Sequence, residues 1–136
     1  MRVLALDYGS ARCGCAVSDP SGTIATPLAP VLQPGTRRGL ARLKSLVDEL
    51  EVQRIVVGLP LSMAGGDTTQ TTETRAFARS LSEVVAVPVE LHDERLTTKL
   101  AARLGGRTSE DSRAAALLLQ SWLDAVGIDQ EMPAHG

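Results

Sequence analysis

Residues 4–19 of this 136-residue chain read LALDYGSARCGCAVSD, and this stretch decides how the rest of the chain is arranged. Its first residues are apolar and end at Asp7, a short turn containing Gly9 follows, and a second strand-like run begins near Arg12. Two such runs joined by a short glycine-containing loop predict an antiparallel pair of strands. Asp7 then stands at the mouth of a buried strand, where a carboxylate is costly unless another group pairs with it.

Size and composition are typical of one soluble globular domain, with 43% hydrophobic and 22% charged residues. Only Tyr8, Phe77 and Trp122 are aromatic, so we expect an aliphatic core and few platforms for base stacking. The net charge of −2 argues against a nonspecific nucleic-acid binder but leaves room for a local basic patch. No segment resembles a signal peptide or a membrane span, so we expect a cytoplasmic protein without a membrane partner.

The two cysteines, Cys13 and Cys15, are two residues apart on a predicted strand and therefore point to the same face. We expect them to be small buried hydrophobic residues. A disulfide between them is disfavoured, and two ligands without nearby partners do not make a zinc site. Free thiols are consistent with a reducing cytoplasm.

The rest of the chain alternates between strand-like and helix-like patterns. After the first hairpin we expect a short strand at 23–26, a proline-containing connector at 27–35, a helix at 36–51, a buried strand at 54–58, a helix at 71–85, a buried strand at 87–92, a short helix at about 96–104 and a last helix at 110–126. Strands linked by helices run parallel, so the strands at 54 and 87 should be parallel to the first.

These elements predict an α/β fold with a five-stranded mixed sheet, in which a three-stranded antiparallel meander is followed by two parallel strands. Helices should flank the sheet, and residues 1–127 should form the single domain, followed by a frayed tail at 128–136. The predicted helix at 36–51 has an unusual charge order. Its basic residues come first and its acids last, which runs against the helix dipole, so its apolar stripe must hold it in place.

In parallel sheets, ligands gather at the carboxyl ends of the strands. Asp7, the loop 58–66 and the pair Asp93-Glu94 all fall at such ends, and Glu110 or Asp111 begins the last helix. Converging carboxylates are hard oxygen ligands that suit Mg²⁺ or Mn²⁺. Two such ions can clamp the attacking and leaving oxygens of a phosphodiester displacement. Two simpler interpretations stay open: a first-turn acid that favours the helix dipole, and an acid paired with Arg95.

Four stretches, in this order, resemble the YqgF/RuvX family, whose members have an RNase H-like fold. They are LALDYGSARCGCAVSD at 4–19, IVVGLPLSMAGGDTTQTTETRAFARSL at 55–81, LHDERLTTKLAARL at 91–104 and DSRAAALLLQSWLD at 111–124. Each stretch alone is a weak signal, but four in the right order make a specific match. One departure concerns the segment 105–110, which is shorter here than the basic loop that many relatives carry.

The resemblance implies a metal-dependent nuclease that acts on structured nucleic acid by a two-metal-ion mechanism with Mg²⁺ or Mn²⁺. The residues that match the family's acids, and that we expect to be both catalytic and metal-binding, are Asp7, Glu94 and Asp111, with Asp93 as the alternate to Glu94. Substrate contacts are expected from Gly9, Arg12, Pro60, Arg95 and Thr98. Arg12 could instead pair with Asp19, and Thr98 could instead cap a helix.

Two substrates are compatible with this resemblance. One is the 5′ end of pre-16S rRNA, processed during ribosome biogenesis, with ribosomal assembly intermediates as partners. The other is the Holliday junction of DNA recombination and repair. A four-way junction needs symmetric nicking and hence a dimer. No sequence feature specifies one, so we expect a monomer or weak homodimer that processes RNA.

Two other function classes are considered. The first is a non-catalytic nucleic-acid or ribosome-assembly module that keeps the fold. The second is an ATP-handling domain that binds phosphate at Gly9-Ser10; this would need a second matching domain, for which the chain is too short.

Overall fold

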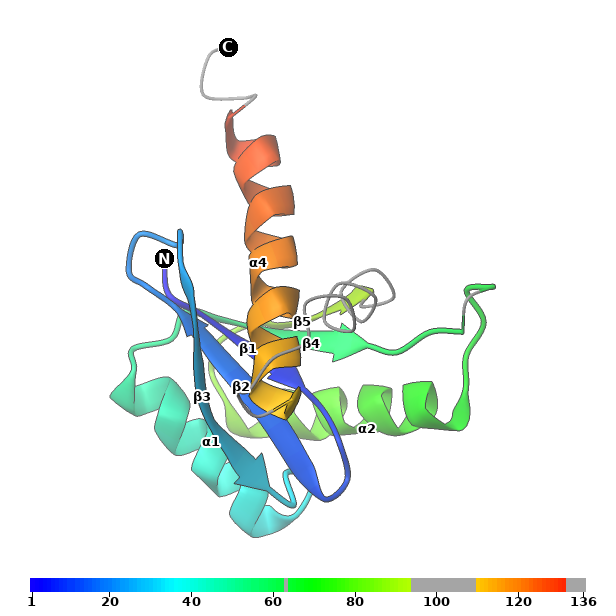
Figure 1. The fold of residues 1–136 in the computed structure, drawn as a ribbon. Coiled ribbons are helices and arrows are strands. Elements are labelled where there is room, and N and C mark those ends of the chain that lie inside the picture. The colour runs from blue at the N-terminus through cyan, green and yellow to red at the C-terminus, as the bar shows by residue number, and fades with distance from the viewer. Residues whose placement is uncertain (63, 94–109, 132–136) are drawn as a thin grey trace.

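The computed structural model describes residues 1–62, 64–93 and 110–131 (Figure 1). The elements are β1 (Val3–Asp7), β2 (Arg12–Ser18), β3 (Ala25–Leu32), α1 (Arg37–Glu49), β4 (Arg54–Leu59), α2 (Thr69–Val84), β5 (Val89–Asp93) and α4 (Glu110–Glu131). In the described part of the chain, none of the helices combines the length and the apolar character that crossing a membrane requires.

The five strands form one mixed sheet in the order β3-β2-β1-β4-β5. β2 runs antiparallel to both β1 and β3, whereas β1, β4 and β5 run parallel to one another. The predicted meander and the two added parallel strands are therefore confirmed. The carboxyl ends of β1, β4 and β5 lie at one edge of the sheet, which we call the carboxyl edge.

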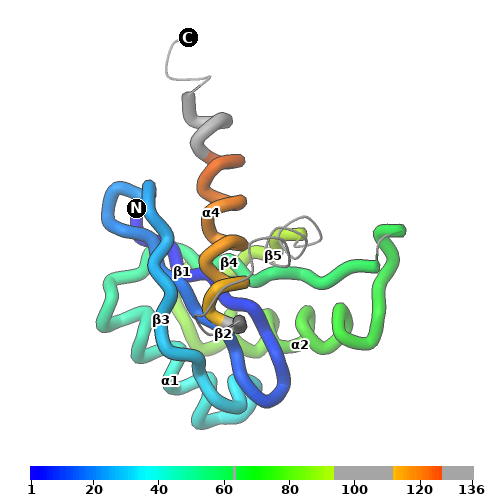
Figure 2. The backbone as a smooth tube through the Cα atoms, viewed as in Figure 1, coloured from blue at the N-terminus to red at the C-terminus, as the bar shows by residue number. Residues whose placement is uncertain are grey.

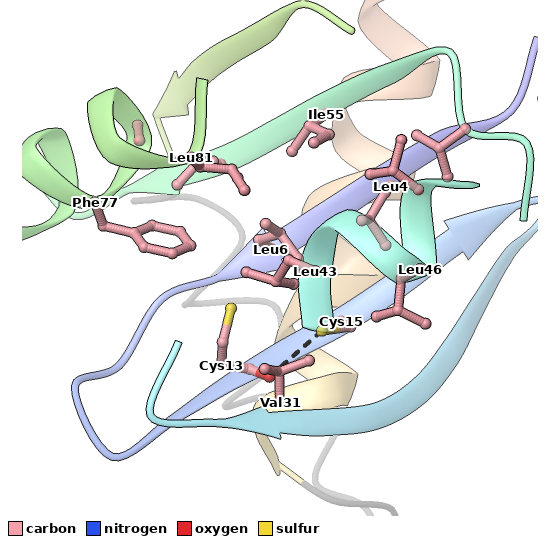
Figure 3. Close-up of a cluster of buried hydrophobic side chains, with 14 of the residues drawn as sticks. Leu4, Leu6, Cys13, Cys15, Val31, Leu43, Leu46, Ile55, Phe77 and Leu81 are labelled. Atoms are coloured by element: carbon pink, nitrogen blue, oxygen red, sulfur yellow. Dashed lines mark hydrogen bonds between the residues drawn. The ribbon is translucent and has the colours of Figure 1, made fainter. Parts of the chain in front are cut away.

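Helices cover both faces of the sheet: α1 and α2 lie side by side on one face, and α4 crosses the other (Figures 1 and 2). Alternate residues of β1 pack in the two hydrophobic layers, one on each face of the sheet. Leu4 and Leu6 pack with α1 and α2, whereas Val3 and Ala5 pack with α4. Figure 3 shows the first layer, in which Cys13 and Cys15 are fully buried as predicted. Each large side chain buried in this way stabilises the fold by about 1.5–3 kcal/mol.

α1 forms where its sequence pattern places it. Thr36 is the N-cap, and its hydroxyl accepts a hydrogen bond from the Gly39 backbone N–H at 3.1 Å. Leu43, Leu46 and Val47 are buried against the sheet, as the apolar stripe predicted. A Cβ atom at Gly39 would lie 2.1 Å from the Gln33 carbonyl oxygen, so only glycine allows the helix to begin this close to the preceding turn.

The third strand is longer than the sequence predicted. Pro27 and Pro30 suggested a connector, but both lie within β3, which continues to Leu32. β3 is an edge strand, where a residue without an N–H is tolerated because that position can face solvent. The register between β2 and β3 shifts between Cys13 and Cys15, where β3 holds one extra residue. This bulge accommodates the proline-containing stretch.

Two further expectations are corrected. β5 was expected to be buried, but its residues are half-buried or exposed because it is the last strand of the described sheet. In α2, Val84 is 36% exposed, whereas the polar residues Thr71 and Thr74 are fully buried. The last helix was expected to end near Val126, and α4 continues to Glu131. The predicted helix at 96–104 lies outside the described residues.

Candidate active site

Asp7 is the last residue of β1 and is half-buried at the carboxyl edge. Leu6 pairs with Val57 of β4, so the same register places Asp7 beside Gly58. Gly58 in turn pairs with His92 of β5. Asp7 on β1, Gly58 on β4 and His92 on β5 therefore lie side by side across three adjacent parallel strands. The middle position carries no side chain.

Two of the strands end in an acid, β1 in Asp7 and β5 in Asp93. These acids lie on opposite faces of the sheet, because successive side chains of a strand point to opposite faces. Asp7 shares its face with Val3 and Ala5, which pack against α4. Asp93 is in register with Leu59 and alternates with His92, so its position belongs to the α1 and α2 face. The structure thus brings both acids to the carboxyl edge but places them on opposite faces of the sheet.

The other predicted ligands are only partly described. Glu94, Arg95 and Thr98 lie outside the described residues. Asp111 belongs to the first turn of α4, and its side chain is likewise outside them. Among the residues that the structure does describe, no three His, Cys, Asp or Glu side chains group closely enough to hold a metal ion.

The first turn of α4 is fixed to the sheet by Ser112, which the sequence analysis missed. This serine is 2% exposed, and its hydroxyl donates to the Leu28 carbonyl oxygen at 2.5 Å. Leu28 pairs with Cys15, and Cys15 pairs with Leu6, the residue before Asp7. The start of α4, which carries Asp111, is therefore fixed above a row of sheet residues that are in register with Leu6, the neighbour of Asp7.

Polar contacts also anchor the middle of α4 to the far strands. The Trp122 indole N–H donates to Glu90 at 3.0 Å, and Arg54 pairs with the other oxygen of the same carboxylate at 2.6 Å. The Arg54 guanidinium lies 6.0 Å from the centre of the Trp122 ring. His92 and Ser121 are hydrogen-bonded at 3.2 Å. These contacts determine how α4 lies across the sheet; local sequence patterns gave no sign of them, because they join distant segments.

The turn after Asp7 explains why residue 9 is glycine. A Cβ atom there would lie 2.7 Å from the Arg12 carbonyl oxygen, closer than real Cβ atoms approach backbone. The glycine therefore serves the hairpin itself, in addition to any contact with substrate. Arg12 begins β2 and is exposed beside this turn.

Tyr8 follows Asp7 and turns to the opposite layer. Its ring stacks on Phe77 of α2, with the ring centres 4.4 Å apart. Burial, followed by the negative charge of Glu73 and the neighbouring Cys13, raises the pKa of the Tyr8 phenol. The stack holds the start of the turn against α2.

Pro60 lies directly after β4 and is held by the beginning of α2. The Thr71 hydroxyl donates to the Pro60 carbonyl oxygen. Thr71 also forms a capping box with Thr68, the N-cap of α2. The predicted substrate loop is therefore anchored to the helix that follows it, through a fully buried threonine.

The model of the RuvX family, described as a Holliday junction resolvase, matches residues 1–125. A protein of Koribacter versatilis (strain Ellin345) named "Putative pre-16S rRNA nuclease" is 42% identical over 142 aligned positions, covering 97% of this chain and 92% of that protein. A protein of Streptomyces avermitilis with the same name is 39% identical over 145 positions, covering 99% of this chain and 93% of that protein.

Solved structures share the fold at low sequence identity. The Thermus thermophilus RuvC structure has a TM-score of 0.63 and 16% identity, covering 93% of this chain and 96% of that one. T. thermophilus RuvC in complex with a Holliday junction substrate has a TM-score of 0.61 and 18% identity, covering 93% and 95%. The likeness shows an RNase H-like fold.

Proposed function

Because the chain belongs to the RuvX family, we propose that it is a metal-dependent nuclease that hydrolyses phosphodiester bonds in structured nucleic acid. The family model spans nearly the whole chain, and relatives at 42% and 39% identity carry the name of a nuclease. The observation that carries the proposal is the position of Asp7. It lies at the carboxyl edge, on the α4 face, beside Gly58 of β4, which carries no side chain.

In this proposal Asp7, Glu94 and Asp111 hold two divalent ions, Mg²⁺ or Mn²⁺. Carboxylate oxygens are the ligands that these ions prefer, and Asp7 supplies one from a half-buried position. The bound ions would supply an activated water and stabilise charge on the phosphate. The role of the protein is to hold the carboxylates in place through β1 and α4, while Arg12 at the adjacent turn binds phosphate.

Glu94 is preferred over Asp93 as the second ligand. Alternation puts the Asp93 position on the opposite face of the sheet from Asp7. A residue one further along the chain would return to the face of Asp7 if the strand pattern continued. The three proposed ligands would then share the α4 face.

The preferred substrate is the precursor of 16S rRNA, since this is the substrate in the names of the curated relatives. A junction resolvase is the second candidate, because the family model carries that description. The two differ in the oligomer they need, because symmetric nicking of a junction requires two active sites in a dimer. We propose a monomer or weak homodimer of the single domain 1–127, acting in the cytoplasm on rRNA precursors within ribosomal assembly intermediates.

The first experiment compares wild type with Asp7→Asn on a precursor rRNA leader and on a four-way DNA junction, each with Mg²⁺ or Mn²⁺. We expect Asp7→Asn to reduce cleavage at least about a hundredfold, since even the outer partners of metal ligands cost 10–100-fold. Asp48→Asn, an exposed acid near the end of α1, should cleave like wild type. Wild-type cleavage of RNA alone supports rRNA processing, and cleavage of the junction alone supports the resolvase.

A thermal melt with Mn²⁺ separates a catalytic site from a binding module. Ions that bind only the folded state stabilise it, by about 2.7 kcal/mol at a hundred times the dissociation constant. We expect the melting temperature of wild type to rise with Mn²⁺ and that of Asp7→Asn to rise less. Equal responses would contradict metal binding at Asp7.

A further inference from the structure

The beginning of α1 carries an unusual concentration of positive charge. Arg37, Arg38, Arg42 and Lys44 lie in its first two turns, and the first acid of the helix is Asp48. All four cations are exposed. Positive charge at a helix N-terminus opposes the helix dipole, and Arg38 and Arg42 are four residues apart, where like charges repel. This arrangement does not serve the stability of α1.

The fold does little to neutralise these charges. Arg42 approaches Glu49 at 3.7 Å, a pair in which both side chains are more than half exposed. Within the described part of the chain, Arg37, Arg38 and Lys44 form no ion pair within 4.0 Å. Arg37 and Lys44 line a groove of about 580 Å³ between α1 and α2, where the acid facing them is Glu83.

The topology places this basic helix start next to the candidate active site. β3 runs parallel to β1, so it ends at the carboxyl edge, and α1 begins five residues later. The connection contacts the hairpin after Asp7 directly: the Gln33 N–H donates to the Ala11 carbonyl oxygen at 2.9 Å. A Cβ atom at Gly35 would lie 3.5 Å from the Tyr8 hydroxyl. Arg12 lies in register with Leu32, just before this connection.

We propose that the first two turns of α1, above all Arg37 and Arg38, bind the phosphate backbone of the nucleic acid. The phosphates that they bind lie outside the active site, beyond the cleaved bond. The inference rests on the proposed function for the identity of the ligand. The surface runs from Arg12 at the edge of the site to Lys44 along α1. It binds by charge, through displacement of counterions from phosphates, and it reads no bases. This surface supplies local positive charge to a chain whose net charge is −2.

The test measures binding of a labelled rRNA-leader hairpin and a four-way DNA junction over a range of salt concentrations, with Ca²⁺ in place of Mg²⁺ to suppress cleavage. The variants are Arg38→Gln and the double variant Arg37→Gln/Arg38→Gln. Each lost phosphate contact lowers the slope of log affinity against log salt by about 0.7–0.9. We therefore expect the double variant to lower the slope by roughly 1.5 and to weaken binding several-fold.

Arg79→Gln is the matched control. Arg79 is exposed on α2, outside the first two turns of α1, and it is not among the residues that line the groove. It changes the net charge as Arg38→Gln does. If Arg79→Gln reduces the salt slope as much as Arg38→Gln, binding follows total charge and the proposal is wrong.

Thermal stability gives an independent check. Removing first-turn cations relieves their conflict with the helix dipole, so the double variant should melt at the same temperature as wild type or slightly higher. Weaker binding together with unchanged or higher stability supports a binding role for the helix. Unchanged binding would overturn the inference even if wild type cleaves, whereas a protein that binds through α1 but cleaves neither substrate would overturn only the proposed nuclease function.

Discussion

The two helical layers of this protein are attached to the same sheet in different ways. α1 and α2 lie on an aliphatic layer built from residues such as Leu43 and Leu81, and their polar contacts are mostly caps within each helix. α4 also buries apolar residues, but it is anchored in addition by Ser112, Trp122 and Ser121, which reach Leu28, Glu90 and His92 of the strands. Hydrophobic contact is non-directional, whereas hydrogen bonds determine position.

In the proposed metal site, α4 carries Asp111 and has to hold its carboxylate at a fixed position relative to Asp7. For that site, the position of α4 along the sheet matters more than that of α1 or α2. We therefore expect changes on the α1 and α2 face to alter stability more than catalysis, and changes to the anchors of α4 to alter catalysis more than stability.

The largest expected effect on stability comes from the α1 layer. Leu43→Ala removes a fully buried side chain and should lower the free energy of unfolding by about 2–5 kcal/mol, measured by urea denaturation. The folded fraction should still cleave at close to the wild-type rate. Leu43→Met, which conserves volume, should cost less than about 1.5 kcal/mol. A Leu43→Ala protein that keeps its stability but loses cleavage would contradict the expectation that the α1 layer affects stability more than catalysis.

A smaller loss of stability, with a larger effect on cleavage, is expected from Glu90→Gln. This change weakens the contact with Arg54 and leaves one neutral acceptor for both Arg54 and Trp122. We expect a loss of about 1 kcal/mol, since the carboxylate is 37% exposed, and cleavage slowed several-fold as α4 loosens. Asp67→Asn, which breaks the exposed pair with Arg75 on the other face, should cost at most about 0.5 kcal/mol. Wild-type cleavage by Glu90→Gln would show that α4 needs no such anchor.

The smallest effect concerns Tyr8, which follows Asp7 and packs in the α1 and α2 layer. Its pKa is raised in the folded state by burial first, then by Glu73 and Cys13, so folding favours the neutral phenol. This contribution is complete below the ordinary value near 10 and is lost as the pH rises through the higher folded value. Wild type should therefore lose more stability than Tyr8→Phe in alkaline solution. Since Tyr8 is the only tyrosine, its ionisation can be followed by absorbance, and an unshifted titration would contradict the prediction.

Much of the fold could be predicted because its signals are local. The first hairpin, the apolar stripe of α1 and the parallel placement of β4 and β5 all follow from short-range patterns, and all are confirmed. The continuation of β3 through residues 27–32 was missed because prolines normally interrupt strands. Only its position at the edge of the sheet, a property of the whole fold, explains why Pro27 and Pro30 are accepted there.

The candidate site was predictable in place but not in detail. Topology alone indicated the carboxyl edge, and Asp7 lies there. The faces of Asp7 and Asp93 could not be compared before the register between β1, β4 and β5 was known, because a shift of one residue exchanges the faces. The contacts of Glu90 with Arg54 and Trp122 join residues more than thirty positions apart, so no local pattern indicates them.

The prolines of β3 also bear on how copies of this protein can meet. An exposed edge strand normally offers a row of N–H groups and carbonyl oxygens to which a strand of another molecule can add. Two of the eight residues of β3 have no N–H to offer, and the bulge bends the strand away from a regular ladder. The β3 edge is thus a poor template for continuing the sheet into a second molecule. We therefore do not expect a dimer of this protein to form by pairing the β3 edges of two molecules.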